Sequence, residues 1–315
     1  MHAVNQAMTD RVEALSMSWR VARAVRQEGW SGEILGVHPR SCYLMDEDGE
    51  IYAIVQEHLG NGPLNLVIPG SAAPPFQQLS VGETVRSNGE VLMLSASLDV
   101  GLAKAELWDP KPYVALGADP DLLRRSLAVL FEAATTDPPD KSLTHLLPYL
   151  EEDDLPARLL KVPHFPRCHA LMAGVAEGLA NRNRRGLKVV TSSLAGLGPG
   201  LTPAGDDFLA GVLLALALVQ QYRADAELGE IGAMLLETAA PRTHEISAAY
   251  LKAAHAGEAN DRWHRLLAAL AAGEPPAIAA SARAVMQTGE TSGADMLAGF
   301  VIAMRAIHDS PATAA

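Results

Sequence analysis

The stretch that decides the fold of the C-terminal half is Gly196–Val219, GLGPGLTPAGDDFLAGVLLALALV. Its second part, Phe208–Val219, is uncharged and apolar, and it is shorter than the roughly 20 residues of a membrane span, which predicts a buried core helix. Segments rich in alanine and leucine surround it at helical spacing. We expect helices at 119–135, 167–182, 204–222, 226–239, 244–256, 260–272, 276–287 and 293–307. Because no strands alternate with them, residues 111–315 are predicted to form an all-helical domain.

Residues 1–110 have a different pattern, in which short β-type runs are separated by turn residues. The runs are EILGVHP (33–39), SCYLM (41–45), IYAIVQ (51–56), LNLVIPG (64–70) and EVLMLSASLDV (90–100). Asp48-Gly49 is a hairpin signal, because glycine adopts the positive φ of such turns. We therefore predict an α+β protein whose N-terminal domain is a small antiparallel sheet or barrel. A leading helix near 10–27 would pack on the sheet, and WDPKP (108–112) would be the linker.

Charge and cysteine content exclude several classes of function. The 315 residues include 25 Lys+Arg and 37 Asp+Glu, for a net charge of −12. Because phosphate binding is largely electrostatic, this balance disfavours nucleic acid and anionic membranes as partners, although a local anion site remains open. The two cysteines, Cys42 and Cys168, have no zinc spacing and predict no disulfide scaffold. The N-terminus has no secretory or transit pattern, so we expect a cytoplasmic protein.

The glycine-rich loop before the apolar run has the features of an anion site. Gly198, Gly200 and Gly205 let backbone N–H groups turn toward a ligand and let it approach closely. Thr202 followed by Pro203 is a good N-cap and first-turn pair. A helix N-terminus carries unsatisfied donors and about half a positive charge, which suits a small anion. The alternative is a plain turn before a buried helix.

Two adjacent aspartates, Asp206 and Asp207, follow in the first turn of that helix. Acidic residues are favourable there because of the helix dipole, which is the simpler explanation of their presence. Two carboxylates side by side are also difficult to solvate, and they become favourable when they hold Mg²⁺ or a positive group. We therefore expect Asp206 and Asp207 to be catalytic residues and candidate metal ligands.

A second segment repeats the first. The pattern G-x-D-[FM]-L-A-G occurs at Gly205–Gly211 and again at Gly293–Gly299, and each copy places a carboxylate, Asp207 or Asp295, at the start of an apolar helix. If the two helices lie side by side, both carboxylates could face one cleft. The second copy is preceded by hydroxyl side chains that could donate to an anion. Its candidate residues are Thr291, Ser292, Gly293 and Asp295, and Ser292-x-x-Asp295 also fits a capping box.

The third segment is PRTHEISAAY, residues 241–250. Thr243 is predicted to be an N-cap, and Ser247 lies four residues on along the same helical face. Arg242 stands at this helix start, where a guanidinium could bind an anionic substrate. The simpler alternative is a solvated surface arginine and an ordinary helix cap.

These three segments together resemble one protein family, the AllH family. The resemblance rests on GLGPGLTPAGDDFLAG (196–211), on the Thr243/Ser247 pair with Gly257 after it, and on TSGADMLAG (291–299). The segment Gly62–Asn65 is also similar to the family. Ala204 departs from the pattern, since many relatives have serine there, which puts one hydroxyl donor in doubt.

The resemblance implies one subunit of oxamate carbamoyltransferase, which works with FdrA-like and other subunits. That enzyme handles oxamate, oxalurate, carbamoyl phosphate and phosphate in purine-ureide breakdown, and small anions of this kind suit a glycine-rich helix N-terminus. We therefore expect Asp206, Asp207 and Asp295 to be catalytic, with Mg²⁺ as a possible cofactor at the first two. The expected substrate-binding residues are Gly198, Gly200, Thr202, Gly205, Arg242, Thr243, Ser247, Thr291, Ser292 and Gly293.

Two functions of other classes remain open at this point. One is a stand-alone Mg²⁺-dependent hydrolase on a helical bundle, for which activity of the isolated chain with a divalent metal would be the signature. The other is a non-catalytic scaffolding subunit, in which the glycine-rich loop is a docking surface.

Overall fold

The computed structural model describes residues 10–70, 76–95, 98–152, 154–223 and 225–309. The chain divides into two compact units, Met1–Pro110 and Lys111–Ala315. Each unit has a hydrophobic core made of its own residues.

The first unit is a curled mixed sheet. Its strands are β1 (Asp10–Glu13), β2 (Ser16–Ser18), β3 (Glu28–His38), β4 (Ser41–Asp46), β5 (Ile51–Gln56), β6 (Asn65–Ile68), β7 (Thr84–Asn88), β8 (Val91–Met93), β9 (Leu98–Gly101) and β10 (Glu106–Trp108). Their order is β1-β9-β8-β7-β3-β4-β5-β6-β2-β10. The expected hairpin joins β4 to β5, and Gly49 at its tip has a φ of 76°.

The structure corrects two details of the sequence prediction for this unit. The sheet is not purely antiparallel, because β1 pairs with β9, β5 with β6 and β10 with β2 in parallel. The leading helix is also shorter than the predicted 10–27. Residues 10–13 and 16–18 pair as strands, and only α1 (Trp19–Val25) is helical, starting where the Ser18 hydroxyl accepts the N–H of Val21. Strand pairing therefore overrides helical spacing in this segment.

The second unit is helical. Its α-helices are α2 (Pro120–Thr136), α3 (Ala157–Leu160), α4 (Phe165–Ala180), α5 (Arg184–Leu194), α6 (Ala204–Arg223), α7 (Ala226–Ala239), α8 (Glu245–His255), α9 (Asp261–Ala272), α10 (Pro275–Met286) and α11 (Ser292–Asp309). Short 3₁₀ helices also occur among the described residues. In the sheet unit there is η1 (Glu57–Leu59), and in the helical unit there are η2 (Leu143–Tyr149) and η3 (Ala240–Arg242). The predicted helices are present within a few residues, whereas α3, α5 and η2 were not predicted. Gly257 follows α8 with a φ of 75°, which confirms the predicted helix end.

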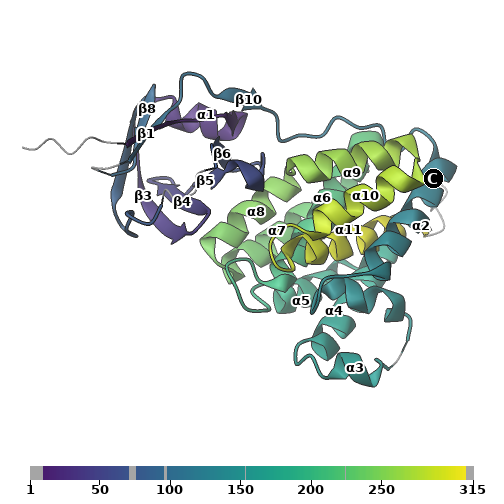
Figure 1. Cartoon of the computed structure of the whole chain (residues 1–315). Helices are drawn as coiled ribbons and strands as arrows, with labels where there is room; N and C mark the ends of the chain where they lie inside the picture. Colours follow the sequence, from purple (N-terminus) through teal and green to yellow (C-terminus); the bar gives the residue numbers. More distant parts are fainter. Residues whose placement is uncertain (1–9, 71–75, 96–97, 153, 224, 310–315) are drawn as a thin grey trace, which may run out of the picture. The chain divides into compact units, whose positions relative to one another are not determined.

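Helix α6 is the core of the helical unit (Figure 1). Among the described helices it alone has the length and hydropathy to cross a membrane, and 72% of its apolar window is buried inside the protein. This burial confirms the prediction of a core helix.

Helices α6 and α11 run parallel and in close contact along their length. Their starts meet where the Thr202 and Ser292 hydroxyls lie 3.1 Å apart, and their ends meet where the Tyr222 hydroxyl lies 2.8 Å from His308 Nε2. Helix α8 lies on α6 in the same direction, because Thr243 before it bonds Asp206 and Gly257 after it lies near Ala217. Three helix N-termini are therefore grouped at one end of the unit.

Candidate functional site

The candidate site lies at the grouped N-termini of α6, α8 and α11. There the loop 196–203 meets the start of α11, and three aspartates, several hydroxyls and backbone N–H groups come together. We call the loop 196–203, which includes Thr202, together with Asp207 and Ser292, the α6–α11 site. The condition set in the sequence analysis, that the two repeated segments lie side by side, is met, since Gly211 packs on the Met296 carbonyl and Gly299 on that of Phe208.

The carboxylate of Asp206 holds the glycine-rich loop in place. Its side chain is buried; Oδ1 accepts the backbone N–H of Gly196 at 2.8 Å, and Oδ2 accepts the hydroxyl of Thr243. One carboxylate thus ties the glycine-rich loop to the start of α8. Both oxygens are already occupied by protein donors, so Asp206 acts here as a positioning residue.

Asp207 is the partly exposed aspartate of the three, and its Oδ2 accepts the hydroxyl of Thr202 at 3.1 Å. The pKa of Asp207 is raised well above its usual value, first because protein atoms crowd its carboxyl. The negative charges of Asp295 and Asp206 raise this pKa further, while hydrogen bonds from Ser292 and Thr202 oppose the rise. Asp207 can therefore hold a proton more readily than an ordinary aspartate while remaining open to a ligand.

Asp295 is the counterpart of Asp207 in the second copy of the motif, and it is fully buried. Its Oδ1 accepts the backbone N–H of Leu143 at 2.6 Å, while Oδ2 has no hydrogen-bond partner among the described residues. Burial raises its pKa to about 7, against the opposing effect of the Leu143 N–H and the Thr291 hydroxyl. The predicted capping box does not form, because the Asp295 carboxylate accepts the N–H of Leu143 and the hydroxyl of Thr291 instead of the backbone N–H of Ser292.

The predicted N-caps are each displaced by one residue. Helix α6 begins at Ala204, and the Pro203 carbonyl accepts the N–H groups of Asp206 and Asp207, which leaves the Thr202 hydroxyl free to bond Asp207. Helix α8 begins after His244, so the Thr243 hydroxyl bonds Asp206 of the neighbouring helix α6 instead of capping α8. In both places the hydroxyl donates to a carboxylate instead of accepting an N–H group of its own helix start.

The glycines of the site have two distinct roles. Gly198 and Gly200 have φ values of 120° and 105°, which L side chains rarely adopt, and they lie at the surface of the loop. Gly205 and Gly293 are instead packing residues. A Cβ on Gly205 would lie 2.1 Å from the Leu194 carbonyl oxygen, and a Cβ on Gly293 would lie 1.9 Å from the Val285 carbonyl oxygen. The structure thus brings Gly198 and Gly200 to the open face and buries the other pair.

The remaining predicted residues lie around this centre. Thr291 is partly exposed, and its carbonyl accepts the N–H of Asp295. Arg242 is exposed on η3, where its guanidinium bonds the Thr238 carbonyl. Ser247 is buried in α8 with no hydrogen-bond partner among the described residues. Arg242 and Ser247 therefore lie at the margin of the site rather than beside Asp207.

Two features of this region were not predicted from the sequence. Leu143, which comes 152 positions before Asp295, contributes a backbone N–H, and no side-chain pattern could reveal such a donor. Buried Cys168 of α4 lies near Asp295, whose charge adds to the burial that raises the pKa of this thiol to about 12. Cys168 is therefore an unreactive core thiol at neutral pH.

The described residues contain no group of three or more His, Cys, Asp and Glu side chains arranged to hold a metal ion. Both oxygens of Asp206 accept protein hydrogen bonds, and Oδ2 of Asp207 accepts the Thr202 hydroxyl. The expectation of Mg²⁺ at this pair stays a prediction.

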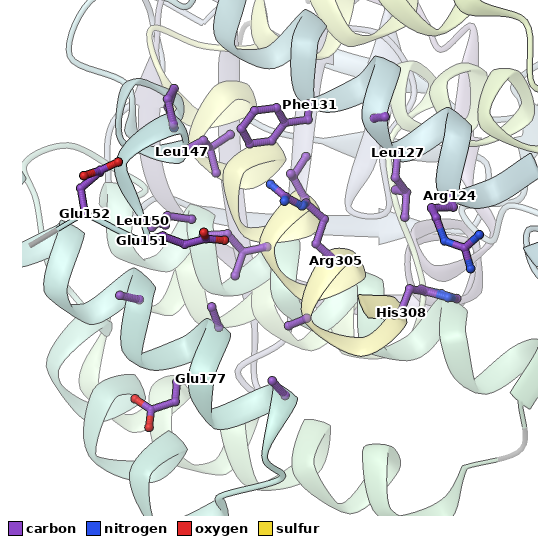
Figure 2. Close-up of a pocket in the computed structure, with 18 of the residues that line it drawn as sticks. Arg124, Leu127, Phe131, Leu147, Leu150, Glu151, Glu152, Glu177, Arg305 and His308 are labelled. Carbon is purple, nitrogen blue, oxygen red and sulfur yellow. The ribbon is translucent and has the colours of Figure 1, made fainter. Parts of the chain in front are cut away.

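A cavity of about 980 Å³ lies far from this site along α11 (Figure 2). It is lined by α2, η2, α4 and the second half of α11, and Arg305 stacks over the Phe131 ring at 4.7 Å inside it. Basic Arg124 and Arg305 and acidic Glu151 and Glu177 line the same cavity. None of the three site aspartates lines this cavity, so its volume does not make it part of the candidate site.

Comparison with known families gives two matches. A family model described as oxamate carbamoyltransferase subunit AllH matches residues 194–304, which contain α6, α8, most of α11 and all three aspartates. A model of the AllH family N-terminal domain matches residues 13–107, the sheet unit. No solved structure matches the chain significantly.

Proposed function

The chain belongs to the AllH family, and on that premise we propose that it binds the small anionic substrate of an oxamate carbamoyltransferase at the α6–α11 site. The family is described as a subunit, so other subunits are part of the enzyme. We propose FdrA-like proteins among them and a cytoplasmic assembly.

The observation that carries this proposal is the position of Asp207. It is partly exposed between the hydroxyls of Thr202 and Ser292, at the start of two parallel helices. Each helix start brings about half a positive charge and unsatisfied N–H donors. The positive-φ loop at Gly198 and Gly200 adds further backbone N–H groups to the same face. A carboxylate or phosphate group on these donors would place the rest of a small substrate beside Asp207.

The reaction needs a group that can exchange a proton. When oxalurate is consumed, a phosphate oxygen bonds to the carbamoyl carbon, the C–N bond breaks, and the nitrogen of the leaving oxamate takes up a proton. The raised pKa of Asp207 suits it to hold and supply that proton. Asp206 and Asp295 would position the loop and η2 around it. Orientation of the substrate supplies most of the remaining effect.

A thermal-unfolding titration of the purified chain tests this proposal. Phosphate, carbamoyl phosphate, oxamate and oxalurate are added separately, with and without Mg²⁺, to wild type and to Asp207→Asn. A ligand at 100 times its Kd adds about 2.7 kcal/mol to the free energy of unfolding, which is a shift of several degrees. We expect such a shift in wild type and a reduced one in Asp207→Asn.

The matched control is Asp121→Asn, another aspartate in a first helical turn, which lies exposed on α2. It should respond to ligands as wild type does. If none of the four anions shifts the unfolding temperature, the site in this chain does not bind them and a scaffolding role is favoured. Metal-dependent hydrolysis by the isolated chain would favour the hydrolase alternative instead.

A further inference from the structure

The two copies of the G-x-D-[FM]-L-A-G motif contact each other reciprocally. A Cβ on Gly211 would lie 1.8 Å from the carbonyl oxygen of Met296, and a Cβ on Gly299 would lie 1.9 Å from that of Phe208. Met296 is the motif counterpart of Phe208, and Gly299 that of Gly211. The same contact is therefore made twice with the roles exchanged, which is the signature of an approximate two-fold relation between α6 and α11.

This relation makes Asp207 and Asp295 equivalent positions whose surroundings differ. Asp295 is covered, and its Oδ1 accepts an amide N–H, that of Leu143, at 2.6 Å. Asp207 is partly exposed. The protein's own backbone thus shows which group a carboxylate in this position accepts.

The hydrogen-bonding capacity around Asp207 points to the same kind of ligand. Asp295 is fully buried, its Oδ2 has no partner among the described residues, and its charge acts on Asp207. The Thr202 hydroxyl is already committed to Asp207 Oδ2. The Ser292 hydroxyl bonds the same carboxyl. The nearby hydroxyl donors are therefore committed, and a ligand group that offers an N–H donor fits the remaining acceptor capacity of Asp207.

We propose that Asp207 is a specificity-determining residue that accepts the amide N–H of the substrate, in the way Asp295 accepts the N–H of Leu143. The inference rests on the proposed function and adds an orientation to it. The carboxylate or phosphate end of the ligand faces the N–H groups of the loop, and the carboxamide end faces Asp207. A ligand with a second carboxylate in place of the carboxamide offers no N–H donor to Asp207 and is bound less tightly when Asp207 is ionised.

Oxamate and oxalate test this directly, because they differ only by a carboxamide in place of a carboxylate. Affinities of both for the full-length chain are measured by calorimetry in wild type, Asp207→Asn and Asp121→Asn. Wild type and Asp121→Asn should bind oxamate at least tenfold more tightly than oxalate. In Asp207→Asn this preference should disappear or reverse, because the asparagine amide can donate to the second carboxylate.

The two proposals fail in different ways. Equal affinity of wild type for oxamate and oxalate, or an unchanged preference in Asp207→Asn, overturns the amide inference and leaves anion binding intact. Failure of wild type to bind oxamate, oxalate and phosphate overturns both proposals. Circular dichroism and the unfolding temperature without ligand show whether Asp207→Asn is folded, and Asp207→Ser is the second variant, expected to lose the preference without gaining an amide donor.

Discussion

At the scale of single residues, Asp295 places a carboxyl where ionisation is unfavourable. Its pKa is about 7 in the folded protein, so the folded chain binds this proton more readily than the unfolded chain. The contribution of Asp295 to the free energy of unfolding therefore falls as pH rises from about 4 to about 7 and becomes level above that range. Asp295→Asn removes this contribution. The difference in unfolding free energy between variant and wild type should shift in favour of the variant by up to about 4 kcal/mol across that window.

Urea unfolding at several pH values between 4 and 8 measures this difference. The reference is Asp121→Asn, whose carboxyl is exposed and should give a curve parallel to that of wild type. Parallel curves for Asp295→Asn as well would contradict the assignment of a buried, protonated Asp295. Titrating groups that do not interact with Asp295 are common to both proteins and cancel from the comparison, whereas Asp207 and Cys168, whose pKa values respond to its charge, add to the difference.

At the scale of secondary-structure elements, the α6–α11 contact depends on glycine. Gly211→Ala would place a methyl group 1.8 Å from the Met296 carbonyl oxygen, which belongs to backbone that cannot rotate away. We expect a loss of about 3 kcal/mol in unfolding free energy, and a similar loss for Gly299→Ala. The control is Gly232→Ala in α7, where the nearest atom is 3.3 Å away on the His255 ring. A change below about 1 kcal/mol is expected there, and similar losses at all three positions would contradict the close contact.

The elements that could be predicted from sequence are those whose own residues decide them. Helix α6 was predictable because its apolar run excludes other structures, and the β4–β5 hairpin because Asp48-Gly49 fits its turn. Helix α5 was not, because its start, Arg184–Gly186, has the composition of a loop and is fixed by the Asn183 cap. The parallel pairs β1–β9 and β2–β10 were also beyond prediction, because they join residues far apart in the chain.

The candidate site follows the same rule. The repeated motif showed that Asp207 and Asp295 could face one cleft if the two helices lay side by side, since both copies have the same helix start. It could not predict that Leu143 would cover one carboxylate and leave the other open, because that difference depends on a backbone group contributed by a distant segment. The asymmetry between the two copies, which carries the inference about the substrate, is thus a tertiary property.

At the scale of the whole molecule, the chain is two units with separate cores joined near Pro110. Tyr113 follows this boundary with 82% of its surface exposed, so chymotrypsin should cleave after it well before it cuts inside either unit. Mass spectrometry of a timed digest identifies the site, and Tyr113→Ala should slow this cleavage selectively. Because all three site aspartates belong to the second unit, the purified fragment 114–315 should keep its helical circular dichroism and its thermal response to phosphate. A fragment that stays folded but no longer responds would show that the sheet unit contributes to the site.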